Sequence, residues 1–258
     1  MPRSPLRLGS LAYWTYFVVT LAIYDAVAFV LWILATPFDK TRTLHHLMNA
    51  WMGSMYLDVK PSWHVTVEGR EKIDRKQTYV YVANHASISD VLMVLKLRTN
   101  FKFVSKASNF RVPLLGWAIS MAEYIPLERG KGESIAKMMA ASRDWLNRGV
   151  SVVMFPEGTR SEDGKLQAFK HGAFTLAREC DVPILPIALH GTHLLSAKNS
   201  RDVAVQAHVR VEVLEPLHPR DYPTNEALIH AARERIRIAL GQEDVAPQPQ
   251  TSRAGAAS

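Results

Sequence analysis

The residues whose types and spacing could do chemistry begin with a histidine and an aspartate five positions apart. In the segment Tyr79-Val-Tyr-Val-Ala-Asn-His-Ala-Ser-Ile-Ser-Asp90, an apolar run leads into a polar turn that contains His85, and Asp90 opens the next apolar run. On one continuous helix these two side chains would point about 140° apart, so they can meet only across a turn. There, the Asp90 carboxylate can accept from one imidazole nitrogen and leave the other nitrogen basic. A pair arranged in this way could serve as a general base.

A structural interpretation of the same residues stays open. Ser87-Ile-Ser-Asp90 matches a capping box, in which Asp90 satisfies backbone N–H groups at a helix start and His85 is an ordinary loop histidine. The spacing by itself favours this interpretation over a catalytic pair.

A second polar turn follows the apolar run at the start of the segment 150–161. Pro156 stops the run, Gly158 permits an unusual backbone angle or the close approach of a ligand, and Arg160 offers a planar fork that suits phosphate. These features predict a phosphate-binding loop. Its composition also fits a plain turn in which Glu157 and Arg160 are solvated.

Considered together, the two turns resemble a known family. Asn84-His-Ala-Ser-Ile-Ser-Asp90 resembles the NHxxxxD motif of the glycerolipid acyltransferase family, and Phe155-Pro-Glu-Gly-Thr-Arg-Ser161 resembles its FPEGTRS motif. The two motifs occur in the family's order, which makes the resemblance specific and favours the catalytic interpretation of His85.

The family's other two blocks also have counterparts. They are Ser105–Gly116 followed by Ile125-Pro-Leu-Glu-Arg129, and Val182-Pro-Ile-Leu-Pro-Ile187. The similarity covers roughly residues 63–215, as one domain would require. Where many members have a Phe-Ile-Asp-Arg-like run, this chain keeps Arg129 and changes its neighbours, so the role of Arg129 is less firmly implied.

The resemblance implies a site and a reaction. His85 would deprotonate an acceptor hydroxyl as it attacks an acyl thioester, and Asp90 would orient the ring. The donor would be acyl-CoA or acyl carrier protein, with no cofactor. The acceptor would be the sn-2 hydroxyl of 1-acylglycerol-3-phosphate, giving phosphatidic acid. The predicted substrate-binding residues are Lys106, Arg129 and Arg160 for the phosphate, Glu157 for glycerol hydroxyls or for positioning Arg160, and the backbone of Gly158 and Thr159.

Other functions stay open at this point. The chain could acylate another lysolipid, such as lyso-ornithine lipid, or hydrolyse the thioester with water in place of the lipid hydroxyl. A non-enzymatic membrane protein that binds lipid is a third alternative. Lys106 could equally be a surface lysine whose stem lies along the membrane.

Short β-prone runs alternate with helical patterns from His64 onward, which predicts an α/β fold with a mixed central sheet flanked by helices. We expect three parts: membrane-anchoring helices over residues 1–58, a catalytic domain over 59–241 and a disordered tail over 242–258. The predicted strands are 65–67, 79–83, 101–104, 151–155, 184–189 and 209–214, and the predicted helices are 90–97, 133–147, 172–180 and 226–240, with Gly149 as a stop signal and Thr224 as an N-cap.

The N-terminal segment predicts membrane attachment. The run from Leu11 to Thr36 is apolar apart from Asp25 and small polar residues, and is long enough to cross a bilayer core of roughly 30 Å. The next segment, Leu44 to Leu57, has the period of an amphipathic helix. It could lie on the membrane surface or pack on the catalytic domain. We expect a cell-membrane protein with its catalytic domain on the cytoplasmic side, although basic residues flank the apolar run on both sides and do not fix its topology.

Composition narrows the classes of partner. The 258-residue chain has a formal net charge of +7, which indicates affinity for an anionic partner. The basic residues are scattered and form no nucleic-acid-binding motif, so we expect no nucleic-acid partner. Cys180 is the single cysteine, which excludes an intrachain disulfide. His190-Gly-Thr-His193 has no carboxylate or cysteine at a recognised spacing, so we predict no metal site.

Overall fold

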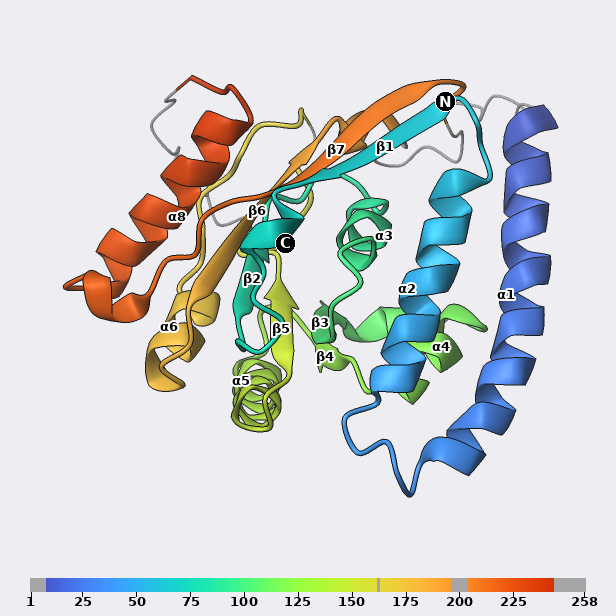
Figure 1. The fold of residues 1–258 in the computed structure, drawn as a ribbon, viewed down its shortest axis with the longest axis horizontal. Helices are drawn as coiled ribbons and strands as arrows, with labels where there is room; N and C mark the ends of the chain where they lie inside the picture. The colour runs from blue at the N-terminus through green and yellow to red at the C-terminus, as the bar shows by residue number, and fades with distance from the viewer. Residues whose placement is uncertain (1–7, 162, 196–203, 244–258) are drawn as a thin grey trace, which may run out of the picture.

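A central β-sheet organises the computed structural model, which describes residues 8–161, 163–195 and 204–243 (Figure 1). Its strand order is β1-β7-β6-β2-β5-β3-β4. Neighbouring strands run parallel except β6 and β7, which are antiparallel. The predicted mixed sheet is therefore confirmed. The strands are β1 (Trp63–Glu68), β2 (Val80–Ala83), β3 (Phe101–Lys106), β4 (Ile125–Leu127), β5 (Ser151–Met154), β6 (Ile184–His190) and β7 (Ala207–Val213).

Helices cover both faces of the sheet. They are α1 (Leu8–Ala35), α2 (Thr43–Asp58), α3 (Asp90–Leu95), α4 (Leu115–Met121), α5 (Gly132–Asn147), α6 (Gly172–Glu179), α7 (Thr192–Leu195) and α8 (Asn225–Ala239), with short 3₁₀ turns at Arg70–Lys72, Ala107–Arg111 and Pro219–Asp221. Gly149, at φ 77°, follows the end of α5, and the Thr224 hydroxyl accepts from the Ala227 N–H at 3.2 Å at the start of α8, both as predicted. The predicted tail lies outside the described residues from 244 onward.

Alternation along the strands divides the core into two layers. Val80 and Val82 of β2 pack into a cluster that includes residues of α5, α6 and α8. Tyr81 and Ala83 point to the opposite face, into a cluster that includes residues of α2 and α3. This strand is buried on both faces, as expected for the centre of a largely parallel sheet.

Helix α2 packs on the catalytic domain. This was one of the two locations that the sequence left open for residues 44–57. Its buried face includes Ala50 and Leu57, which belong to the core cluster beneath the sheet. Gly53 lets α3 approach closely, since a Cβ at this position would lie 2.9 Å from a Leu95 methyl group. The opposite face leaves Leu47 and Trp51 exposed.

A buried lysine connects the turn between α1 and α2 to the sheet by a hydrogen bond. Lys102 of β3 is fully buried, and its Nζ donates to the carbonyl oxygens of Thr41 at 2.8 Å and Ala122 at 2.7 Å. The same ammonium group lies 4.4 Å from the centre of the Trp145 ring. Burial lowers the pKa of Lys102 to about 7. Nearby, Arg42 forms an ion pair with Glu123 at 2.7 Å.

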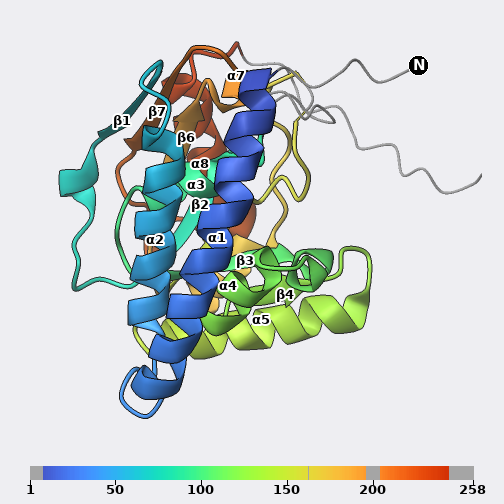
Figure 2. The same cartoon turned by 90° about the vertical axis from the view of Figure 1, so that its right-hand side faces the viewer.

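Helix α1 lies outermost, against α2 and α4 (Figures 1 and 2). By length and composition it is the one described helix that could cross a membrane, and only 22 % of its most apolar window is buried inside the protein. Asn49 links it to its neighbours, because this side chain accepts from the Tyr24 hydroxyl at 2.5 Å and donates to the Ala118 carbonyl at 3.3 Å. The exposed apolar side chains of α1 are Leu8, Leu11, Val18, Val19, Ile23, Val27, Phe29, Val30, Ile33 and Leu34.

The two faces of α2 should respond differently to truncation. Leu57→Ala is expected to lower the free energy of unfolding by about 2–5 kcal/mol, because it leaves a cavity in the core. Trp51→Ala, on the exposed face, should change this free energy by less than about 1 kcal/mol and weaken binding to lipid vesicles instead. Chemical unfolding in detergent and vesicle sedimentation measure the two effects. Equal destabilisation by both substitutions would contradict this division of α2.

Candidate active site

The predicted site residues gather at one edge of the sheet because four neighbouring strands run parallel. In the order β2-β5-β3-β4, the carboxyl ends of these strands meet at the same edge, where α/β proteins bind ligands. His85 lies two residues beyond β2, and Glu157 lies three residues beyond β5. Lys106 is the last residue of β3, and Arg129 lies two residues beyond β4. Sequence-distant motifs are therefore brought side by side by strand pairing.

His85 and Asp90 meet across a turn, as predicted. The distance from His85 Nδ1 to Asp90 Oδ2 is 2.7 Å, and the same oxygen accepts from the backbone N–H groups of Ala86 at 2.7 Å and Ser87 at 2.8 Å. Asp90 is fully buried, whereas the His85 side chain keeps 13 % exposure. Because a carboxylate can only accept here, Nδ1 carries the proton and Nε2 is the basic nitrogen. Asp90 thus binds the backbone of the turn before α3 and orients the His85 ring at the same time. A role of His85 as general base stays a prediction.

Phe155 and Asn84 support the histidine, and neither residue was assigned a role from the sequence. The Phe155 ring stacks on the His85 ring with 4.2 Å between centres and 21° between planes. Asn84 donates to the Leu189 carbonyl at 3.0 Å and accepts from the Leu189 N–H at 2.7 Å, which joins β2 to β6 beside the histidine. Their positions in the sequence could have indicated a role, because each residue directly follows a central strand.

Glu157 connects the two motifs through the backbone. Its side chain is buried, and its two oxygens accept from the N–H groups of His85 at 2.7 Å and Gln167 at 3.2 Å. The Ser161 N–H donates to the His85 carbonyl at 2.7 Å, which adds a second link. Burial raises the pKa of Glu157 to about 8, although the two N–H donors oppose the shift. In this structure both carboxyl oxygens of Glu157 already accept hydrogen bonds from backbone N–H groups. Contact between Glu157 and substrate hydroxyls stays a prediction.

Gly158 adopts the left-handed conformation that the sequence anticipated, with φ 73°. A Cβ at this position would lie 2.7 Å from Lys170 Nζ, so the lysine ammonium group rests directly against the glycine backbone. The Lys170 N–H also donates to the Pro156 carbonyl at 2.9 Å, which fixes the start of this side chain under the loop. Lys170 lies twelve positions from Gly158, so the sequence did not indicate this contact.

The predicted phosphate-binding arginines lie within electrostatic reach of each other. Partial desolvation lowers the pKa of the Arg129 guanidinium, and the positive charge of Arg160 lowers it further. Two like charges held close together favour an anion between them. Lys106 and Thr159 are exposed at the same edge. Binding of substrate by these residues stays a prediction.

Among residues 8–161, 163–195 and 204–243, no group of three or more His, Cys, Asp or Glu side chains is arranged to hold a metal ion. Two histidines of the described residues lie beside other polar groups. His46 Nε2 lies 2.7 Å from the Thr99 carbonyl oxygen, and His190 Nε2 lies 2.9 Å from Glu212 Oε2.

At this edge of the sheet, a buried carboxylate orients a histidine next to a glycine turn and two arginines. The family model described as Acyltransferase matches residues 64–190. The chain belongs to this family.

Its relatives carry a consistent name. The chain is 35 % identical over 234 residues to a chloroplastic 1-acyl-sn-glycerol-3-phosphate acyltransferase of Arabidopsis thaliana, covering 88 % of this chain and 65 % of that protein. A chloroplastic enzyme of the same name from Brassica napus is 34 % identical, with 84 % and 64 % covered. The chain thus spans slightly less than two thirds of these plant relatives. The alpha form from Ovis aries is 30 % identical, with 85 % and 77 % covered.

The fold also has a solved counterpart. The crystal structure of the 1-acyl-sn-glycerophosphate acyltransferase from Thermotoga maritima is similar with a TM-score of 0.79 and 25 % sequence identity. The match covers 90 % of this chain and 93 % of that one. The similarity therefore includes more than the region matched by the family model.

The raised pKa of Glu157 gives the stability of the fold a specific pH dependence. Between about pH 5 and pH 8, the folded protein keeps this proton and the unfolded chain has released it, so stability falls as pH rises and levels off above about pH 8. Glu157→Gln should remove this slope. Thermal unfolding of both proteins across this range measures it. A slope that is the same in the variant would assign the proton to another group.

Proposed function

We propose that this protein transfers a fatty acyl group from a thioester to the sn-2 hydroxyl of 1-acylglycerol-3-phosphate, giving phosphatidic acid. The observation that carries the proposal is the 2.7 Å contact between His85 Nδ1 and Asp90 Oδ2, at the edge of the sheet where Arg129 and Arg160 lie within electrostatic reach of each other. The names of the relatives support the choice of acceptor.

The reaction follows from the orientation of the imidazole. His85 Nε2 takes the proton of the acceptor hydroxyl as the oxygen attacks the thioester carbonyl carbon. The carbon–oxygen bond forms, the carbon–sulfur bond breaks, and the proton passes from the imidazolium to the departing thiolate. Asp90 keeps the ring in the required tautomer and stabilises the imidazolium. Phe155 limits rotation of the ring by stacking on it.

The acceptor phosphate would bind between Arg129 and Arg160, with Lys170 and the Gly158 backbone on the near side of the loop. Guanidinium groups bind phosphate through paired hydrogen bonds, and a lysine ammonium group adds charge without fixed direction. Lys106, at the end of β3, would supply a further cation at the rim.

Membrane attachment through α1 would place the site where its substrates reside. The acceptor and the product both carry long acyl chains that partition into lipid. We propose a cell-membrane location with the catalytic domain on the cytoplasmic side, where acyl-CoA and acyl carrier protein occur. Assays with each thioester will identify the donor.

Removing the general base should abolish transfer. His85→Ala is expected to lower kcat by on the order of a hundredfold or more. Asp90→Asn should also lower kcat strongly, because the amide can still accept from the helix start but no longer stabilises an imidazolium. Acylated product is measured with purified protein and both thioester donors. Normal product formation by His85→Ala would eliminate this mechanism.

The same assay separates the alternative functions. Free fatty acid formed in place of acylated lipid would identify a thioester hydrolase. Lipid binding that survives in His85→Ala, with no product from the unmodified protein, would identify a lipid-binding protein instead of an enzyme.

Arg160 should determine selection of the phosphate. Arg160→Ala is expected to lower kcat/KM for 1-acylglycerol-3-phosphate by roughly ten- to a hundredfold, the value of a lost charged hydrogen bond, and to leave an uncharged monoacylglycerol almost unaffected. Arg75→Ala, before β2 at the opposite edge of the sheet, is the matched control. If Arg160→Ala affects both acceptors equally, or if lyso-ornithine lipid is the better acceptor, the proposed acceptor is wrong.

A further inference from the structure

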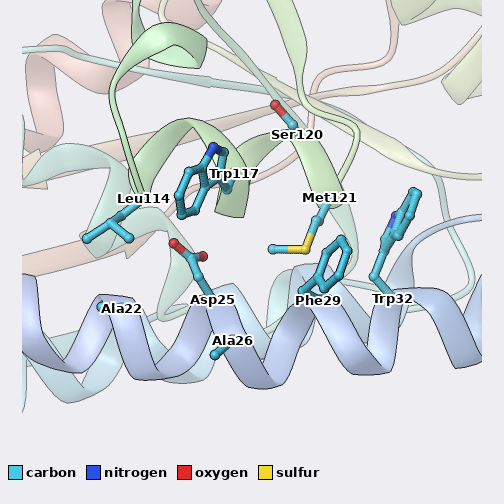
Figure 3. Close-up of a pocket in the computed structure, with 9 residues that line it drawn as sticks. All are labelled: Ala22, Asp25, Ala26, Phe29, Trp32, Leu114, Trp117, Ser120 and Met121. Carbon is cyan, nitrogen blue, oxygen red and sulfur yellow. The ribbon is translucent and has the colours of Figure 1, made fainter.

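A groove lies between the outer helix α1 and helix α4, away from the residues of the catalytic motifs. Its volume of about 660 Å³ is within the usual range for a small-molecule site. Figure 3 shows side chains from both helices facing this space. They are Ala22, Asp25, Ala26, Phe29 and Trp32 of α1, Leu114, which directly precedes α4, and Trp117, Ser120 and Met121 of α4.

Asp25 is the single ionisable group in a lining that is otherwise almost wholly apolar. It is only 4 % exposed, and neither carboxyl oxygen has a hydrogen-bond partner among the described residues. In Figure 3 its side chain points from α1 across the groove toward Leu114 and Trp117. A buried carboxyl group without a partner is costly, and an ionisable residue in an apolar helix of this kind generally marks a functional site.

The other polar groups on this part of α1 are already satisfied within the protein. The Thr20 hydroxyl donates to the Tyr16 carbonyl at 2.6 Å, and the Tyr24 hydroxyl donates to Asn49 at 2.5 Å. Asp25 differs from them because it faces the groove. A group that enters the groove is therefore the natural partner for its carboxyl oxygens.

The surroundings define the chemistry of that group. The aliphatic and aromatic walls fit an alkyl chain, and the exposed apolar face of α1 gives lipids access from a bilayer. A hydroxyl both donates and accepts, so it can pair with Asp25 in either protonation state. An ammonium group pairs only with the ionised form, and a second charge in an apolar groove is more costly to desolvate.

We propose that this groove binds a lipid alkyl chain that carries a hydroxyl group, and that Asp25 recognises the hydroxyl. The inference does not depend on the proposed reaction, because no residue of the catalytic motifs lines the groove. Asp25 acts here as a specificity-determining group, and the apolar walls supply most of the affinity.

Equilibrium binding to the full-length protein in nanodiscs tests the proposal. The probes are methyl 12-hydroxyoctadecanoate and methyl octadecanoate, which differ by one hydroxyl and carry no charged head group. The hydroxylated probe should bind about five- to tenfold more tightly, the net value of one hydrogen bond. Equal affinity for the two probes would overturn the proposal.

Three variants locate the effect. Asp25→Leu should abolish the preference and still bind methyl octadecanoate, which also shows that the groove is intact. Asp25→Asn should keep much of the preference, because an amide still pairs with a hydroxyl. Ala26→Met should weaken both probes by filling the groove and leave their ratio unchanged. A preference that persists in Asp25→Leu would exclude Asp25 as the recognising group.

Turnover measurements distinguish whether the hydroxylated alkyl chain belongs to a substrate or to a bilayer lipid. If the hydroxylated chain belongs to a substrate, kcat/KM should favour the hydroxylated thioester or acceptor, and Asp25→Leu should remove that preference. If it belongs to a bilayer lipid, the binding preference remains without any preference in turnover. An inactive protein that still discriminates between the probes would reject the proposed reaction and leave this site standing.

Discussion

One buried oxygen organises the catalytic edge of this protein. Oδ2 of Asp90 receives three donors: the imidazole Nδ1 of His85 and the backbone N–H groups of Ala86 and Ser87. The same contacts set the path of the turn, the first residue of α3 and the direction of the histidine ring. Each donor satisfies an acceptor that would otherwise be costly in a fully buried position. The contacts that fix the local backbone are therefore the same ones that orient the His85 ring.

This turn is held in register by more distant contacts. The His85 backbone is fixed from the β5 side by Glu157 and Ser161, while Asn84 fixes the same turn to β6. Because β5 and β6 are the two neighbours of β2 in the sheet, hydrogen bonds fix the position of the turn that contains His85 from both sides. Small displacements of catalytic groups lower the reaction rate of an enzyme strongly, and these hydrogen bonds oppose such displacements.

How far the sequence predicts this site depends on the range of each contact. The meeting of His85 and Asp90 follows from five residues and the geometry of a turn. The function of Glu157 as a link does not, since its partners are 72 and 10 positions away and both are backbone groups without sequence identity. The strand β4 was missed because three residues with a proline carry almost no periodic signal. The position of α2 could not be decided, because an amphipathic period fits membrane and protein surfaces equally.

The lysine beneath the turn between α1 and α2 has a mechanical consequence. Lys102 joins Thr41 of that turn to Ala122 at the end of α4, and Asn49 joins α1, α2 and α4 farther along. These two separated connections link α1 and the turn that follows it to the sheet and to α4. If α1 is embedded in lipid, as proposed above, these connections predict that a change in bilayer thickness tilts the whole molecule. The distance of His85 from the lipid surface would then change with the tilt angle of the protein.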